Sequence, residues 1–264
     1  CEVTNAQGSV PSNTVTLTVN PQGTVPDNTW VKVNTGSPVA RYYSTLYNNC
    51  SATILRSEPV GRAFSGVASG GGKIFYFGGS HGSHSGNDVE LFDALTNTWT
   101  QQPNPQQNPQ NPPECFPACC GATNTCAQGS VDFNACNAAQ GGHDATVSTP
   151  TGAPYSLHTY QKMAYDAFRN KFVLAAGNGI FTYDAATRTW THVVNTNFNT
   201  DTSNKALVYD PDLQTELFIH GNSVCAIFRV DHAAGQLIKE TDYHPSMPRQ
   251  WSEIASAYDP DRRL

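Results

Sequence analysis

Short apolar segments alternate with turn residues along most of the chain. Residues 74–77, 172–175 and 217–219 are almost wholly apolar, and each follows a turn sequence such as Gly-Gly, Asp-Ala or Asp-Pro. Each is followed by another segment that ends at Asp, a tight turn and a last segment, which carries Trp in two of the three cases. Apolar runs of this length between turn residues are typical of β-strands. The pattern predicts units of four antiparallel strands.

These units repeat in the sequence. One motif aligns on Asp166, Asp210 and Asp259, which are 44 and 49 residues apart, within the segments 163–174, 207–218 and 257–261. A second motif places Asp before a turn in the segments 91–100, 182–191 and, more weakly, 229–237. A four-stranded repeat of this length is the size of one blade of a β-propeller.

The spacing also locates an insertion. Asp184 and Asp231 are 47 residues apart, but Asp93 and Asp184 are 91 apart. The longer gap therefore contains one repeat and about 45 further residues, which correspond to the Pro/Gln/Cys-rich stretch near 102–150. Two interpretations of this stretch remain open, a specificity element on one face and a tolerated surface insertion.

Composition favours the same fold class. The chain of 264 residues contains 27 Thr, 22 Asn, 21 Gly and 17 Pro. Thr and Asn are poor helix formers, and Gly and Pro interrupt helices. We therefore predict an all-β protein in which the mass consists of strands and turns.

Several positions resemble the kelch repeats of the galactose-oxidase-like superfamily, in its secreted bacterial form. They are Gly78-Gly79 after a second strand, the aromatic-Asp pairs before a last turn, and Trp99 and Trp190, six residues after that Asp. The resemblance spans about residues 62–264 and implies an incomplete kelch-type propeller of three to four blades, which we assign to 30–264. Trp99 and Trp190 would then be core residues between blades. The resemblance implies little about function, because propellers serve binding, scaffolding and catalysis alike.

The N-terminal segment has a different pattern. Residues 1–5 and 14–19 alternate apolar and polar positions around a turn at 6–9. Residues 1–20 resemble the last two strands of an immunoglobulin-like sandwich, which implies that the partner of Cys1 lies upstream. Residues 21–29 are a linker. We expect the sequence to be a fragment, with further blades following Leu264.

Charge and hydropathy exclude two classes of partner. The chain has 15 Lys and Arg against 21 Asp and Glu, for a net charge of −6, and its basic residues are scattered. Non-specific nucleic-acid binding requires clustered cations, so we expect none. No apolar run approaches the roughly 20 residues that cross a bilayer.

Eight cysteines bear on the compartment. Five of them fall between positions 115 and 136. In so polar a chain they favour disulfides and an extracellular or cell-surface location, and zinc is the alternative, although the paired C-x2-C spacing of zinc knuckles is absent. The candidates for disulfides are Cys50, Cys115, Cys119, Cys120, Cys126, Cys136 and Cys225. The spacing alone does not select their connectivity.

Four residues are candidates for ligand binding. His81, His84 and Asn87 follow the Gly-Gly pair, and His158 precedes the first strand of the next unit. The position of the first three resembles a Gly-Gly, His, Gly-Asn-Asp segment of secreted kelch-like proteins, and His158 resembles the His of an Arg-His-Thr-Tyr run in the same family, with Leu157 in place of the Arg. Two imidazoles three residues apart could share a ligand or a metal. Solvated or turn-capping roles are the alternative, and we predict no metal or cofactor.

Enzyme signatures are weak. The chain has no G-x-S-x-G, G-x-x-x-x-G-K-[ST] or H-E-x-x-H motif. A radical copper oxidase needs two Tyr, two His and a Cys, and although Tyr243-His244 is an adjacent pair, it falls between repeats. The Asp-Pro-Asp sequences at 210–212 and 259–261 recur once per unit, so we interpret them as turns.

The sequence therefore predicts an extracellular binding or adhesion module for carbohydrate or a surface protein. The ligand would bind at the propeller face that holds His81, His84, Asn87, His158 and the cysteine-rich insertion. One alternative is an enzyme on extracellular carbohydrate, either a metal-dependent oxidase or a lyase. Another is a structural module without a ligand.

Overall fold

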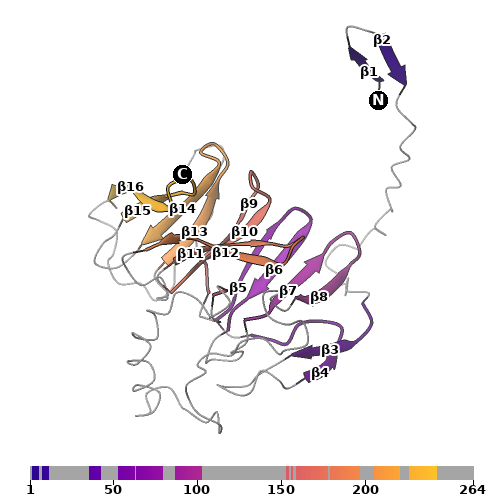
Figure 1. Cartoon of the computed structure of the whole chain (residues 1–264). Helices are drawn as coiled ribbons and strands as arrows, with labels where there is room; N and C mark the ends of the chain where they lie inside the picture. The colour runs from indigo at the N-terminus through magenta and orange to yellow at the C-terminus, as the bar shows by residue number, and fades with distance from the viewer. Residues whose placement is uncertain are drawn as a thin grey trace, which may run out of the picture. The chain divides into compact units, whose positions relative to one another are not determined.

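The computed structural model describes residues 2–5, 8–11, 36–42, 53–62, 64–79, 87–102, 153–154, 156, 159–177, 179–196, 205–220 and 226–242. The chain divides into two compact units, Cys1–Val33 and Asn34–Leu264. In the described residues every regular element is a strand (Figure 1). No helix in this part of the chain has the length and apolar character to cross a bilayer.

The described residues of the first unit form one antiparallel pair of strands, β1 (Glu2–Asn5) and β2 (Gly8–Pro11). Asn5 lies opposite Gly8, so only two residues remain for the connection, which is the shortest common hairpin link. The second strand thus begins where the sequence predicted a turn at 6–9. The predicted strand at 14–19 lies outside the described residues, and the immunoglobulin-like assignment stays a prediction.

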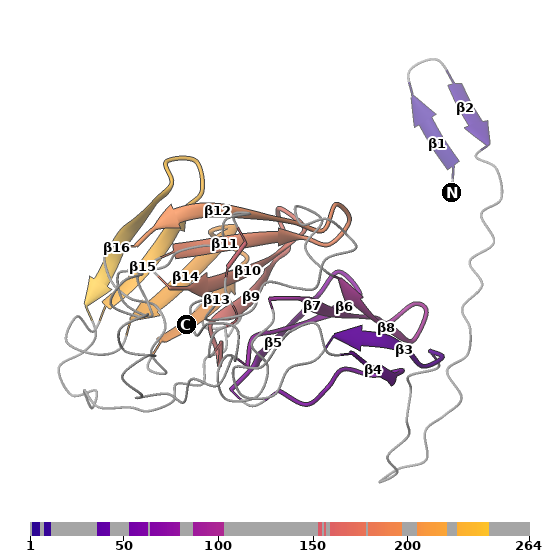
Figure 2. The same cartoon turned by 60° about the horizontal axis from the view of Figure 1, so that its bottom comes forward.

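In the second unit, the residues that the structure describes form three four-stranded antiparallel sheets, each with its strands in sequence order (Figures 1 and 2). Blade 1 consists of β5 (Gly66–Gly70), β6 (Lys73–Phe77), β7 (Val89–Asp93) and β8 (Thr98–Gln102). Blade 2 consists of β9 (Met163–Asp166), β10 (Lys171–Ala176), β11 (Gly179–Asp184) and β12 (Thr189–Asn195). Blade 3 consists of β13 (Lys205–Asp210), β14 (Thr215–His220), β15 (Ala226–Asp231) and β16 (Gln236–Asp242). A two-stranded sheet, β3 (Val39–Tyr42) and β4 (Thr53–Arg56), precedes blade 1. The all-β fold with propeller-type blades is confirmed.

Blades 1 and 2 meet along their first strands, β5 and β9. At the beginning of these strands, the Gly66 amide donates a hydrogen bond to the Thr159 hydroxyl, just before β9. At their ends, a Cβ on Gly70 would lie 1.9 Å from the Tyr165 ring, so only glycine permits this approach. The two strands therefore run in the same direction.

Blades 2 and 3 meet in the same way. Near the beginning of the strands, the amide of Leu207 in β13 donates to the carbonyl oxygen of Gln161, just before β9, at 2.9 Å. After them, Arg169 Nη1 donates to the Gln214 carbonyl oxygen at 2.8 Å. The first strands β5, β9 and β13 are thus parallel, and equivalent turns of all three blades lie at the same edge.

The core lies between blades, in two apolar clusters on the opposite faces of blade 2. Because side chains alternate along a strand, β10 contributes to both. Phe172, Leu174 and Ala176 belong to the first cluster, and Val173 and Ala175 to the second. Blade 1 adds Phe75, Phe77, Val89 and Leu91 to the first cluster, and blade 3 adds Leu207, Phe218 and Val230 to the second. Burial on both faces explains why this strand is a continuous apolar run in the sequence.

The two predicted core tryptophans differ in their surroundings. Trp190 is 3 % exposed and packs edge-on against Phe77 of blade 1, with ring centroids 5.2 Å apart. It is therefore a core residue between blades, as predicted. Trp99 is half-buried and packs against Phe92 and Tyr76 of its own blade. The same face of blade 1 carries Glu90, which forms an ion pair with Arg41 of β3, so this face lies toward β3 and not toward blade 2.

The repeated Asp residues organise the turns, as the sequence predicted for Asp210. One carboxylate oxygen of Asp210 accepts hydrogen bonds from the amides of Asp212 and Leu213, at 2.9 and 3.1 Å. Asp93, Asp166, Asp184 and Asp231 accept equivalent bonds from the amides that follow them. In each turn the fourth residue after Asp has a positive φ, at Asn97, Asn170, Arg188, Gln214 and Gly235. These turns serve the fold, because they recur with it.

Candidate functional site

The two edges of the blades differ in the length of their connections. At one edge, which we call the tight-turn edge, the strands are joined by 71–72, 94–97, 167–170, 185–188, 211–214 and 232–235. At the other, the long-connection edge, the chain passes through 78–88, 103–162, 196–204 and 221–225, and only the connection at 177–178 is short. All connections longer than four residues within and between the three blades therefore leave from one edge.

The predicted ligand-binding residues belong to connections of the long-connection edge. His81 and His84 are in the connection from β6 to β7, and His158 is in the connection from β8 to β9; all three lie outside the described residues. Asn87 is described and fully buried, and its Nδ2 donates to the Pro154 carbonyl oxygen at 3.4 Å. Asn87 thus links the first of these connections to the second.

Thr159, the neighbour of His158, is fixed between the strands of blade 1. Its hydroxyl donates to the Phe77 carbonyl oxygen at 2.9 Å, and its amide donates to the Phe64 carbonyl oxygen at 2.9 Å. Because Phe77 ends β6, the chain at Thr159 lies beside the point where the connection with His81 and His84 begins. The described residues that flank the three histidines are therefore close together.

A buried network of charges supports the beginning of β7. Arg62 Nη2 donates to Asp88 Oδ2 at 2.6 Å and lies 3.9 Å from Glu90 Oε1. Arg41 of β3 forms an ion pair with Glu90 Oε2 and donates to the Trp99 carbonyl oxygen at 2.8 Å. Two buried cations thus face two buried carboxylates, and the network joins the β3–β4 sheet to blade 1. Sequence reasoning missed it, since nothing in the spacing relates Arg41 to Glu90.

The environment of Glu90 changes its proton affinity. Burial raises the pKa of Glu90 to about 7, against the opposing effect of the nearby Arg62 and Arg41. The Asp88 carboxylate adds to the increase. The group is remote from solvent, so we assign it a structural role at the base of the long-connection edge.

A pair of basic residues, Lys205 and His220, lies at the same edge in blade 3. Lys205 begins β13 and pairs with His220 at the end of β14. Burial and, to a lesser extent, the Lys205 charge together lower the pKa of His220 to about 4. The His220 imidazole is therefore neutral near pH 7. Both side chains are buried, so they support this edge rather than face solvent.

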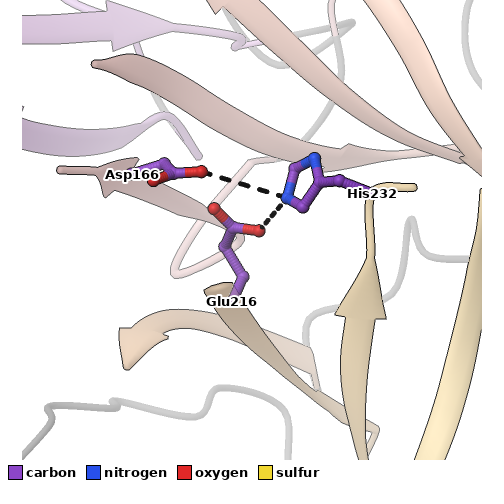
Figure 3. A group of neighbouring side chains, drawn as sticks. All are labelled: Asp166, Glu216 and His232. Carbon is purple, nitrogen blue, oxygen red and sulfur yellow. Dashed lines mark hydrogen bonds and ion pairs between the residues drawn. The ribbon is translucent and has the colours of Figure 1, made fainter. Parts of the chain in front are cut away.

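A different group of polar side chains lies at the tight-turn edge, where blades 2 and 3 meet. It consists of Asp166 at the end of β9, Glu216 in β14 and His232 after β15 (Figure 3). One donor atom from each side chain lies within 4.8 Å of the other two. His232 Nε2 is 2.6 Å from Glu216 Oε2 and 4.0 Å from Asp166 Oδ2. These three residue types are common ligands of divalent transition metals.

Arg169 completes this group on the side of Asp166. Its Nη1 donates to Asp166 Oδ2 at 2.8 Å, and its amide donates to Oδ1 at 2.9 Å. Both oxygens of Asp166 therefore have donors. Glu216 differs, because its Oε1 is buried and has no hydrogen-bond partner.

Glu216 and His232 were not among the predicted site residues, although the aligned repeats contain the signal for them. Glu216 aligns with Phe172 of blade 2, and His232 aligns with Ala185 and Ala94. The preceding repeats have apolar residues at these two positions. The blade fold therefore does not require Glu or His there, and the exchange is a signal of another role.

The remaining sequence candidates lie outside the described residues. They include all eight cysteines and the Tyr243-His244 pair. The disulfide prediction and the copper-oxidase alternative are therefore untested by the structure.

Among the comparisons with known proteins, the match to a family model agrees with the blade architecture. No curated protein matches the sequence. The solved structure of YjhT aligns with 82 % of this chain and 69 % of its own, at 16 % identity and a TM-score of 0.38. Residues 61–106, which contain blade 1, match the family model of the Kelch motif. The motif and the four-stranded blades support a kelch-type β-propeller, a fold that commonly serves as a binding or protein-interaction module.

Proposed function

We propose that the chain is an extracellular or cell-surface binding module whose long-connection edge holds carbohydrate or a surface protein. The observation that carries this proposal is the separation of connections between the two edges. Tight turns that recur with the fold occupy one edge, and connections of unequal length and sequence leave from the other. Binding residues are found disproportionately on such variable loops, because a rigid scaffold positions them.

The residues proposed to contact the ligand are His81, His84 and His158. Imidazole can donate or accept hydrogen bonds, which suits recognition of hydroxyl groups on sugars or of polar groups on proteins. Asn87 is buried and bonded to Pro154, so its role is to hold two connections together.

The proposed location rests on the cysteines. Five of the eight fall in 22 residues of a polar insertion, and a short polar segment requires covalent links to hold a shape. Such links persist in an oxidising compartment.

A glycan array probed with the labelled full chain tests the proposal. We expect hits that are lost in a His81→Ala/His84→Ala variant and in a His158→Ala variant. Leu95→Ser is the matched control, because Leu95 is 92 % exposed at the tight-turn edge of the same blade. Hits that survive both histidine changes would contradict the assignment of the edge.

A second assay covers the protein ligand. Binding of the labelled chain to intact cells is measured before and after protease treatment, with the same three variants. Protease-sensitive binding that requires the histidines supports a surface protein as ligand. Absence of binding in both assays would contradict the proposed function.

A further inference from the structure

We propose that Asp166, Glu216 and His232 form a binding site for a divalent transition-metal ion, of the Zn²⁺ or Mn²⁺ class, at the junction of blades 2 and 3. The site lies at the tight-turn edge and is therefore independent of the function proposed for the opposite edge.

The three ligands converge from separate parts of two blades. Asp166 comes from the first strand of blade 2, Glu216 from the second strand of blade 3, and His232 from the last turn of blade 3 (Figure 3). Their donor atoms lie within 4.8 Å of one another. Zinc binds nitrogen and oxygen donors at about 2.0–2.2 Å, so one ion can reach all three after small side-chain movements.

A separate observation favours a cation at this position. The carboxylates of Asp166 and Glu216 are fully buried, and Glu216 Oε1 has no hydrogen-bond partner. Figure 3 shows this second oxygen of Glu216 on the side of Asp166, away from the bond to His232. A buried carboxylate oxygen without a partner is unfavourable, and a cation held between the two carboxylates removes that cost.

The donor types select the class of metal. An imidazole nitrogen with two carboxylates suits Zn²⁺ and Mn²⁺, whereas Ca²⁺ and Mg²⁺ prefer oxygen ligands alone. Three protein ligands leave at least one coordination position for water. Arg169 supports the site from outside by orienting Asp166 through two hydrogen bonds, as outer partners of metal ligands commonly do.

Comparison of the aligned positions in blades 2 and 3 indicates that the site is specific to blade 3. The positions of Glu216 and His232 correspond in blade 2 to Phe172, which lies in the apolar core, and Ala185, which packs against it. The fold therefore accepts an apolar pair here, and the polar pair at the junction of blades 2 and 3 has another role.

Isothermal titration of the full chain with ZnCl₂ and MnCl₂, after dialysis against a chelator, tests the proposal. We expect the parent chain to bind one ion. Glu216→Gln and His232→Ala should each lower the affinity for this ion by at least about tenfold. Glu240→Gln is the matched control, since Glu240 is an exposed carboxylate of the same blade that pairs with Arg229.

A Co²⁺ spectrum separates this site from the cysteines. Cobalt bound to nitrogen and oxygen lacks the intense near-ultraviolet band of cobalt–thiolate bonds. We therefore expect no such band from the Co²⁺ ion that the parent chain binds and the two single variants do not.

A Glu216→Phe/His232→Ala variant copies the apolar pair of blade 2 and should fold without binding metal. This variant keeps the test valid if a single variant unfolds. No Zn²⁺ or Mn²⁺ binding by the parent chain up to 1 mM, or binding that survives the double change, would overturn the proposal.

Discussion

Glu216 in blade 3 occupies the position that Phe172 occupies in blade 2. Each is the second residue of its second strand, and each pairs with a tyrosine of the first strand, Tyr209 or Tyr165. The Phe172 ring stacks on Phe75 of blade 1 with centroids 4.8 Å apart, whereas Glu216 Oε2 forms a hydrogen bond with His232 Nε2. Equivalent junctions are thus apolar between blades 1 and 2 and partly charged between blades 2 and 3.

The replacement of an apolar pair by Glu216 and His232 predicts how the stability of the junction between blades 2 and 3 responds to mutation in the presence of a chelator. His232→Ala removes one partner of a buried pair and should lower the free energy of unfolding by about 3 kcal/mol. Glu216→Phe/His232→Ala should recover most of that loss, because apolar replacement of a buried charged pair is often neutral or stabilising. Urea denaturation of the three proteins measures both effects. A double variant less stable than His232→Ala would contradict the equivalence of the two junctions.

The turn at 185–188 predicts a stabilising substitution. Arg188 has a φ of 59°, a left-handed conformation that costs about 1 kcal/mol in an L-residue with a Cβ and nothing in glycine. Arg188→Gly should therefore raise the free energy of unfolding by about 0.5–1 kcal/mol. Thr187→Gly, in the same turn but without a positive φ, should lower it. Thermal unfolding measures the stability of the two variants. Equal changes in stability would argue against the left-handed conformation of Arg188.

The sequence contained enough information to predict the turns and strands of the blades. The Asp residues at 166 and 210 mark turns whose hydrogen bonds are local, so a repeated short motif was sufficient to locate them. The apolar run at 172–175 predicted a strand because burial on both faces leaves no polar position in it. Both features can be recognised within a short stretch of the sequence.

The contacts between different sheets were not predictable in the same way. Arg41 and Glu90 are 49 residues apart, and neither belongs to a recognisable motif. Asp166 was correctly interpreted as a turn residue, but its place beside His232 depends on how two blades pack. Comparing the repeats position by position would have singled out Glu216, because packing rather than local structure determines which residues that position accepts.

The two tryptophans should differ in their effect on stability. Trp190 is almost fully buried between Phe75, Phe77 and Tyr183, so Trp190→Ala should cost about 3–5 kcal/mol. Trp99→Ala should cost less than half as much, because Trp99 is only half-buried and packs within its own blade. Chemical denaturation followed by circular dichroism measures both. Similar losses would place Trp99 in a core between blades as well.

The cysteines give a prediction about the whole chain. We expect fewer than eight thiols to react in the denatured, unreduced protein, because the cluster at 115–136 favours disulfides. The same protein after reduction should give eight and serves as the control. Eight reactive thiols before reduction would contradict both the disulfides and the argument for an oxidising compartment.

The buried charge network predicts a change of stability with pH. Burial raises the pKa of Glu90 from 4.5 to about 7 in the folded chain, so between these values the folded state holds a proton that the unfolded state releases. The contribution of Glu90 to stability is therefore fully present below about pH 4.5 and is lost as the pH rises through 7.

Glu90→Gln removes this titration while keeping the shape and the hydrogen-bonding capacity of the side chain. The parent chain should lose about 1–3 kcal/mol relative to Glu90→Gln between pH 5 and pH 8, measured by urea denaturation at each pH. Glu240→Gln, at an exposed carboxylate, should show no such relative change. A parent chain that gains stability relative to Glu90→Gln as the pH rises would mean that the Arg41 and Arg62 charges outweigh burial, because the ionised carboxylate would then be the favoured form in the fold.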